Sequence, residues 1–160
     1  MPAAYAAGLL TLEEAVEVVY HRSTEQQKMA GCGRLLVVGM AADKARALLE
    51  AHGYAGDVEV ACVNSAESTV LAGDEARLLE LKQSVIPSSV ATTFVEGNIA
   101  FHSSRMEPIL PAMRARLAAV LGGAGAGNSQ WSLPFVSTVT GRVEARVDAD
   151  YWCVEINVDN

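Results

Sequence analysis

A histidine at the end of an apolar run is the first residue whose type and place suggest chemistry. His102 follows Ile99-Ala100-Phe101, which is predicted to form the end of a strand, and precedes two serines; the chain has only three histidines. An imidazole changes charge near neutral pH, so it can take up or release a proton in a site. Residue type alone favours a structural role, either capping the next helix or packing with both ring nitrogens satisfied.

Arg22 is the second candidate, because a guanidinium presents a rigid fork of donors that matches a carboxylate. Its position near the end of a predicted helix allows a structural alternative, since the helix dipole favours positive charge there. His21 beside it is predicted to be a surface residue rather than a ligand, and His52 next to Gly53 a structural residue.

Other nucleophiles and ligands are less well placed. None of the serines at positions 23, 65, 103 and 104 lies in a glycine-flanked elbow. Cys32, Cys62 and Cys153 are odd in number and lack metal-ligand spacing. We expect no disulfide framework, no metal site and a reducing, cytoplasmic location.

Composition excludes several classes of protein. The chain has 160 residues, of which 51% are hydrophobic, enough for one domain with a core. A net charge of −7 argues against a nucleic-acid partner. Apolar runs are too short to span a membrane, and the uncharged start predicts no signal peptide.

The glycine-rich segment Gly122 to Asn128 is predicted to be a linker rather than a phosphate-binding loop. Such a loop needs a strand before it, whereas here a helix precedes it.

The first predicted helix begins at a capping box in which Thr11 is the N-cap and Glu14 the third helical residue. The helix is predicted to run to Gln27. Its buried face is predicted from the apolar period, with Leu12, Ala15, Val16 and Val19 facing the core.

The central part of the chain predicts the order β-α-β-β-α-β, typical of a ferredoxin-like arrangement in an α/β protein. The expected strands are 34–40, 58–63, 68–72 and 90–95, and the expected helices are 41–52 and 74–84. A further helix over 106–121, a strand over 135–140, a turn at Gly141-Arg142 and a new element from Asp148 are expected to follow.

Several segments together resemble the acyltransferase domain of modular polyketide synthases, which is related to malonyl-CoA:acyl-carrier-protein transacylases. They are AAYAAGLLTLEEAVEVVYHRS, GRLLVVGM, VACVNSAESTVLAGD, IAFHSSRMEPIL, PFVSTVTGR and DADYW, in the family's order and spacing. The resemblance implies a ferredoxin-like small subdomain, here 29–98, inserted in an α/β-hydrolase-like large subdomain. Parts of the large subdomain would be 1–28 and 99–160.

The resemblance also implies a two-step acyl transfer. In the family, a serine in a Gly-His-Ser-x-Gly elbow attacks an acyl-CoA thioester while a histidine takes its proton. The acyl group then passes to the phosphopantetheine thiol of an acyl carrier protein. By match to the family's segments, His102 is that base, and Arg22 is the arginine that pairs with the free carboxylate of malonyl-type substrates. The two side chains would then face each other around a common cleft. No bound cofactor is implied, and the implied partners are acyl-CoA, the carrier protein and neighbouring synthase domains.

The residues before the histidine correlate with substrate choice in this family. Phe101 would fill the space that a substrate α-methyl group needs, so the resemblance predicts malonyl over methylmalonyl. Ala100 fits that pattern, whereas Ile99 matches neither the malonyl nor the methylmalonyl pattern. One methyl group is worth about 1–3 kcal/mol in such a pocket.

The family's nucleophile is not among these residues; by register it would fall just before Met1. We therefore expect a truncated acyltransferase fragment that is inactive alone. The family's pattern also ends at Trp152, because residues 153–157 depart from it. Elements that would pair with missing strands are expected to expose apolar surface.

Two alternatives stay open. The chain could be a non-catalytic module that binds a carrier protein or acts as a scaffold, with Arg114 and Arg116 as a basic docking patch. An unrelated ferredoxin-like sensor of small molecules would account for residues 34–95 only.

Overall fold

The computed structural model describes residues 1–122 and 133–157, which divide into two compact units. The helical unit comprises Met1–Lys28 and Pro108–Ile156, and the sheet unit is built on Met29–Glu107. Beyond Gly122, the predicted linker lies outside the described residues. Each unit is described by itself below.

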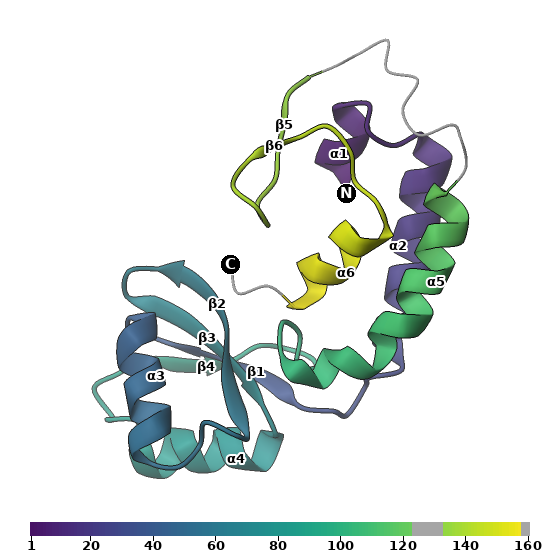
Figure 1. Cartoon of the computed structure of the whole chain (residues 1–160). Helices are drawn as coiled ribbons and strands as arrows, with labels where there is room; N and C mark the ends of the chain where they lie inside the picture. The colour runs from purple at the N-terminus through teal and green to yellow at the C-terminus, as the bar shows by residue number, and fades with distance from the viewer. Residues whose placement is uncertain (123–132, 158–160) are drawn as a thin grey trace. The chain divides into compact units, whose positions relative to one another are not determined.

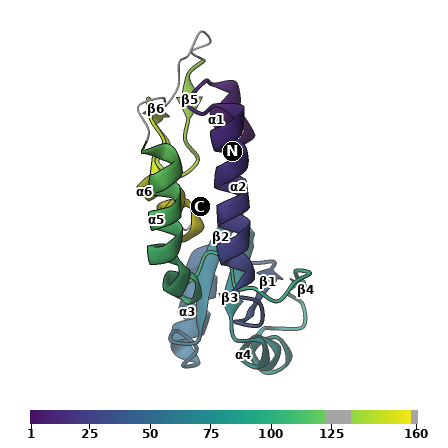
Figure 2. The same ribbon diagram turned by 90° about the vertical axis from the view of Figure 1, so that its right-hand side faces the viewer.

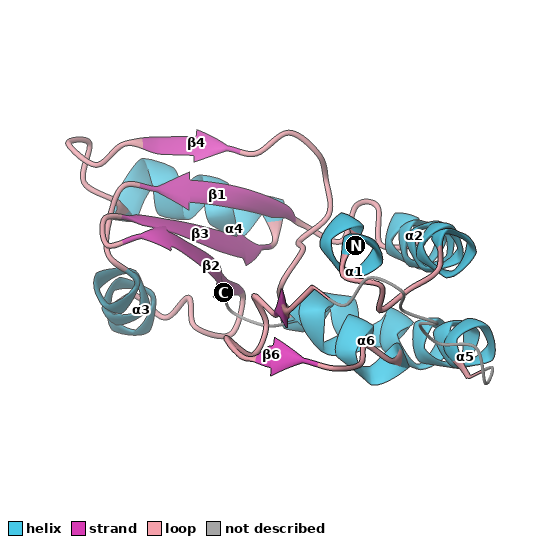
Figure 3. Cartoon of the chain, turned by 90° about the horizontal axis from the view of Figure 1, so that it is seen from above, coloured by secondary structure: helices cyan, strands magenta, loops and turns pink. Residues whose placement is uncertain are grey.

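The sheet unit is an α/β structure with one antiparallel sheet. Its elements follow the predicted order: β1 (Arg34–Val38), α3 (Ala42–Ala51), β2 (Val58–Ser65), β3 (Ser68–Gly73), α4 (Glu75–Glu80) and β4 (Thr92–Phe94). The strands lie in the order β2-β3-β1-β4, and each neighbouring pair is antiparallel (Figure 3). The helix after β3 is shorter than predicted, because a π-helical turn, Leu81–Val85, continues it.

Alternation along β1 divides the sheet unit into two apolar layers. Leu36 and Val38 are completely buried in the cluster that includes Ala45 and Leu49 of α3 and Leu78 of α4. On the opposite face, Leu35 and Val37 pack with Ala61, Val70, Ala72 and Ala100. The helices therefore cover one face, and the segment around residue 100 packs on the other.

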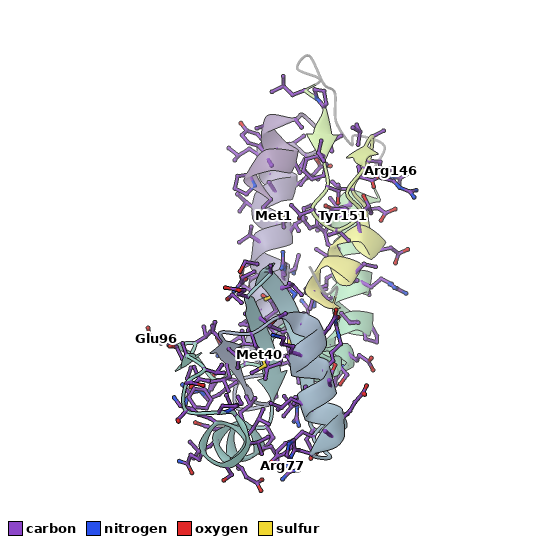
Figure 4. The ribbon with its side chains drawn as sticks, turned by 90° about the vertical axis from the view of Figure 1, so that its left-hand side faces the viewer. Met1, Met40, Arg77, Glu96, Arg146 and Tyr151 are labelled. Carbon is purple, nitrogen blue, oxygen red and sulfur yellow. The ribbon has the colours of Figure 1, made fainter. Side chains whose placement is uncertain are left out.

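The helical unit contains α1 (Pro2–Ala6), α2 (Leu12–Gln27), α5 (Leu110–Leu121) and α6 (Ala149–Asn157). Helices α2 and α5 lie side by side (Figures 1 and 2). The predicted strand over 135–140 is only β5 (Phe135–Val136), paired with β6 (Val143–Glu144). Between them, Gly141 has φ of 67°, as the predicted turn requires. Tyr151 on α6, labelled in Figure 4, hydrogen-bonds Ser137 after β5 at 2.9 Å.

Helix α2 begins and ends where the sequence predicts, but its predicted buried face is wrong. The Thr11 amide donates to Glu14 Oε2 at 2.7 Å, and the Glu14 amide donates to Thr11 Oγ1 at 3.1 Å. Leu12 and Val16 are 61% and 59% exposed, whereas Val18 is fully buried. Helix α5 packs on the opposite side of α2, and that packing rather than the apolar stripe decides which side is buried.

Two predictions around residues 99–121 are also wrong in detail. Ile99-Ala100-Phe101 forms no strand, and Phe101 and His102 form a turn instead. The predicted helix over 106–121 divides into a 3₁₀ helix, Ser104–Ile109, and α5. Pro108 and Pro111 lie at this junction, and neither has the amide hydrogen that a continuous α-helix would use. In the described parts of the chain, no helix is long and apolar enough to cross a membrane.

Candidate functional site

His102 lies in a backbone turn of unusual conformation. Its φ is 58°, and it is the only non-glycine residue with positive φ among the residues that the structure describes. This left-handed region costs an L-residue roughly 1–2 kcal/mol, although histidine is found there more often than most residues. The side chain is half-buried. A residue kept in such a conformation must be held by its surroundings, and strain of this kind gathers at functional sites.

Contacts within the turn supply part of that support. Ser103, only 3% exposed, donates its hydroxyl hydrogen to the Ala100 carbonyl at 2.7 Å. The Met106 amide donates to the Ser103 carbonyl at 3.0 Å. Ala100 is completely buried on the sheet, and Gly33 permits that approach. A Cβ on Gly33 would lie 3.0 Å from the Ala100 Cβ and 2.3 Å from the Gly73 carbonyl oxygen.

Contacts with two residues distant in sequence, Glu59 and Cys32, attach the turn to the rest of the sheet unit. Glu59 of β2 accepts the Ser104 amide at 3.1 Å through Oε2 and the Ser104 hydroxyl through Oε1. Arg105 donates from its guanidinium to the Cys32 carbonyl at 3.1 Å. Sequence reasoning missed Glu59, because 45 residues separate it from Ser104 and no local pattern marks the pair.

The three residues predicted to set substrate choice differ in exposure. Ala100 is completely buried against Ala61, Val70 and Ala72, so its side chain belongs to the apolar layer of the sheet. Ile99 and Phe101 are half-buried and retain accessible surface.

Arg22 lies in the last part of α2, in the other unit. It is half-buried, and its neighbour His21 packs edge-on against Tyr20 with 5.3 Å between ring centroids. The His21 imidazole also lies 3.2 Å from the Glu17 carboxylate one turn earlier. Since Arg22 and His102 lie in different units, their predicted proximity stays a prediction.

One turn beyond Arg22, a buried carboxylate joins α2 to α5. Glu25 is 1% exposed and pairs with Lys28 at 2.5 Å and with Arg116 at 3.0 Å. Lys28 donates a hydrogen bond, whereas the Arg116 contact is an ion pair without hydrogen-bond geometry. Both cations are about half exposed, which leaves their charge partly solvated.

The other arginine of the suggested docking patch is also paired within the helical unit. Arg114 Nε lies 2.8 Å from the Asp150 carboxylate of α6. With Arg116 bound to Glu25, both positive charges are partly neutralised by acids of the same unit. This arrangement weakens the case for a basic surface that attracts an acidic carrier protein.

The remaining reactive groups of the described residues do not form a metal centre. No group of three His, Cys, Asp or Glu side chains in the described residues could hold a metal ion. Cys153 is 2% exposed, and burial raises the pKa of its thiol. In the sheet unit, burial raises the pKa of Tyr54, whose ring lies 4.3 Å from the Arg77 guanidinium.

An apolar groove runs along the exposed side of α2. Its volume is about 520 Å³, and it begins near Met1, which Figure 4 labels. The groove contains the face that was predicted to be buried. It is lined by Met1, Pro2, Tyr5, Leu12, Ala15, Val16, Val19 and Tyr20.

Comparison with known proteins gives one consistent family. The family described as "Acyl transferase domain" matches residues 1–157. Probable polyketide synthase 1 of Dictyostelium discoideum is 36% identical over 140 residues, which is 86% of this chain and 4% of that protein. The hybrid PKS-NRPS synthetase pynA of Aspergillus niger is 34% identical over 157 residues, which is 94% of this chain and 4% of that protein. The chain therefore spans a small part of the length of these relatives.

Solved structures agree with the sequence comparisons. The acyltransferase domain from the second module of the salinomycin polyketide synthase superposes with a TM-score of 0.79 at 31% identity. That match covers 98% of this chain and 35% of the other. A malonyl CoA-acyl carrier protein transacylase from Burkholderia pseudomallei has a TM-score of 0.80 at 19% identity, over 97% of this chain and 51% of the other. At that identity the likeness shows a shared fold alone.

Proposed function

The chain belongs to the acyl transferase domain family, and from that premise we propose that it works within an acyltransferase domain of a polyketide synthase. The domain would transfer a malonyl-type unit from CoA, through an acyl-serine, to the phosphopantetheine thiol of an acyl carrier protein. Acyl-CoA and the carrier protein would be its partners, together with neighbouring synthase domains. Relatives that are polyketide synthases support this assignment.

We assign the sheet unit to a ferredoxin-like small subdomain, with residues 29–98 as its proposed extent. The support is the β-α-β-β-α-β order, with β1 between β3 and β4 and every neighbour antiparallel. That order is the one in which two β-α-β units interlock. The helical unit, together with residues 99–107, would belong to an α/β-hydrolase-like large subdomain.

The observation that carries the catalytic proposal is the strained turn at His102. A general base must meet the nucleophile at hydrogen-bond distance, which requires a fixed imidazole. The turn holds the residue at φ of 58° and leaves the side chain half-buried. His102 would take the proton of an attacking serine and later return a proton to the leaving group, so that the base is regenerated.

Arg22 is the proposed clamp for the free carboxylate of a malonyl group, and Phe101 the proposed barrier to an α-methyl substituent. Both are half-buried, so each side chain keeps surface that a substrate could contact. Charge-assisted hydrogen bonds to a carboxylate contribute about 1.5–3 kcal/mol, enough to separate malonyl from acetyl substrates.

Residues 1–160 contain no Gly-His-Ser-x-Gly sequence. We therefore propose that these residues alone do not form the acyl-serine, and that transfer needs an elbow supplied by other residues of an acyltransferase domain. No bound cofactor is required by this chemistry. The cytoplasmic location stays a prediction from the scattered cysteines.

Transfer from malonyl-CoA to a carrier protein tests the proposal, in an acyltransferase domain that includes these 160 residues. His102→Gln should lower kcat/KM by about 10²–10⁴-fold, the usual contribution of a general base. His52→Gln, at an exposed helix end of the sheet unit, serves as the control and should change little. Transfer that survives His102→Gln would refute the assignment of the base.

The same assay tests Arg22 by comparing acyl groups. Arg22→Ala should reduce transfer of malonyl groups by about 10–100-fold more than transfer of acetyl groups, because only malonyl has a free carboxylate. Equal losses for the two substrates would show that Arg22 supports the structure rather than the substrate.

A further inference from the structure

Glu59 is placed to control the conformation of the His102 turn through its bonds to Ser104. It lies on β2, an edge strand of the sheet. Along β2 the side chains of Val58 and Val60 enter the core beneath the helices, so Glu59 emerges on the opposite face. That is the face on which Ala100 packs.

The geometry of β2 next to Glu59 helps to direct this carboxylate toward the turn. The pairing of β2 with β3 shifts in register just after Glu59, between Val60 and Cys62, and such bulges change the direction of side chains beside functional sites. Ala61 and Cys62 consequently both belong to the apolar layer on the turn's side. Glu59 lies at the border of that layer, where its oxygen atoms reach Ser104.

Two bonds from one carboxylate fix both the backbone and the side chain of Ser104. The amide hydrogen reaches Oε2 and the hydroxyl hydrogen reaches Oε1. Ser104 begins the 3₁₀ helix and lies two positions after His102. A negative charge that accepts an amide at the start of a helix stabilises that first turn.

We propose that Glu59 is a positioning residue for His102: its carboxylate holds Ser104 and thereby keeps the strained turn in the conformation that aims the imidazole. This inference rests on the proposed function for its catalytic meaning. Its structural part does not, because the bonds from Glu59 to Ser104 exist whatever His102 does. The free energy of these charge-assisted bonds offsets the strain of the left-handed backbone at His102.

The structural part can be tested on the chain itself by amide hydrogen exchange. Glu59→Ala should speed exchange at Ser104 by at least about 10-fold, since a local hydrogen bond of about 1.4 kcal/mol corresponds to that factor. The amide of Val37, within paired strand β1, should keep its protection. Glu50→Ala, an exposed acid on α3, is the matched control and should change neither amide.

The catalytic part is tested by a double-mutant cycle in an acyltransferase domain that includes these residues. Glu59→Ala should lower kcat about 10-fold for malonyl and acetyl groups alike, with little change in KM. Glu59→Gln should recover most of the loss, because its amide group can still bond Ser104. In the His102→Gln background, Glu59→Ala should cause no further loss, since a positioning residue acts only through the group it positions.

The outcomes separate the two claims. Equal losses from Glu59→Ala with and without His102 would overturn the positioning role and leave a general structural one. If His102→Gln itself retains transfer, the proposed function fails, while the exchange result at Ser104 still decides whether Glu59 holds the turn. Should Glu59→Ala not fold, Ser104→Ala removes only the hydroxyl bond and should give a smaller loss of the same kind. No loss from Ser104→Ala would also count against the role.

Discussion

Replacing His102 by glycine and by alanine measures the strain of its turn directly. At φ of 58° the Cβ of alanine retains the steric cost of the left-handed region, whereas glycine lacks it. Both variants lose the imidazole and its contacts, so the difference between them isolates the backbone. We expect the His102→Gly variant to be more stable than the His102→Ala variant.

The magnitude follows from two opposing terms. Relief of the left-handed backbone contributes about 1–2 kcal/mol in favour of glycine. The greater freedom of glycine in the unfolded chain costs about 0.5–1 kcal/mol. The net difference at position 102 should be about 0–1.5 kcal/mol in favour of glycine, with a central value of about 0.75 kcal/mol.

Glu96 provides the matched reference position, since it is exposed, lies in the same connection after β4 and does not have positive φ. There only the unfolded-state term acts, so alanine should be more stable than glycine by about 0.5–1 kcal/mol. The two positions should therefore show opposite signs.

Urea denaturation followed by circular dichroism gives the four free energies of unfolding, with the slope of each transition checked for constancy. If alanine is more stable than glycine by the same amount at position 102 as at Glu96, the turn is not strained, and the argument that His102 is held in place by its surroundings is wrong.

Three further predictions concern the helical unit. Arg116→Ala should lower the free energy of unfolding, measured by urea denaturation, by about 1 kcal/mol, because buried Glu25 loses one of its two half-exposed cations. An unchanged free energy would show that Lys28 alone is enough to neutralise Glu25. Exposed apolar surface favours association, so we expect the chain to self-associate through the apolar groove and Val16→Lys to reduce this in sedimentation velocity at equal concentration. An unaltered distribution would contradict this. Cys153 should react with a thiol reagent more slowly than half-buried Cys32, and fast labelling of Cys153 in the folded chain would contradict its burial. Because burial raises the pKa of this thiol, its contribution to the free energy of unfolding should be present below pH 9.0 and lost as the pH rises above it.

Local patterns in the sequence were sufficient for the bounds of several elements. The capping box predicted where α2 begins, and the helix predicted from residue 74 does start there, with Asp74 as the N-cap that accepts the amides of Ala76 and Arg77. Alternating β-branched residues predicted the strands of the sheet unit in their correct order. These signals succeed because each depends on residues only a few positions apart.

The buried side of α2 needed tertiary information. Its apolar stripe at Leu12, Val16 and Val19 is a true helical pattern, yet those side chains are exposed. The contact with α5 instead buries Val18 and a carboxylate, which no hydrophobicity pattern selects. Periodicity identifies a helix and its apolar face, but the packing partner decides which side is covered.

For the candidate site, too, some features followed from the sequence and others depended on the tertiary structure. Sequence alone determined that His102 follows a short apolar run and precedes a helical segment, and the match of its motifs to one family led to its role. Only the tertiary structure decided that the run forms a turn, that the backbone at His102 is left-handed, and that Glu59 holds Ser104. The physical reason is the distance along the chain over which each interaction acts. Capping and alternation act between near neighbours, whereas the strained backbone at His102 is maintained by hydrogen bonds from a strand that is far away in sequence.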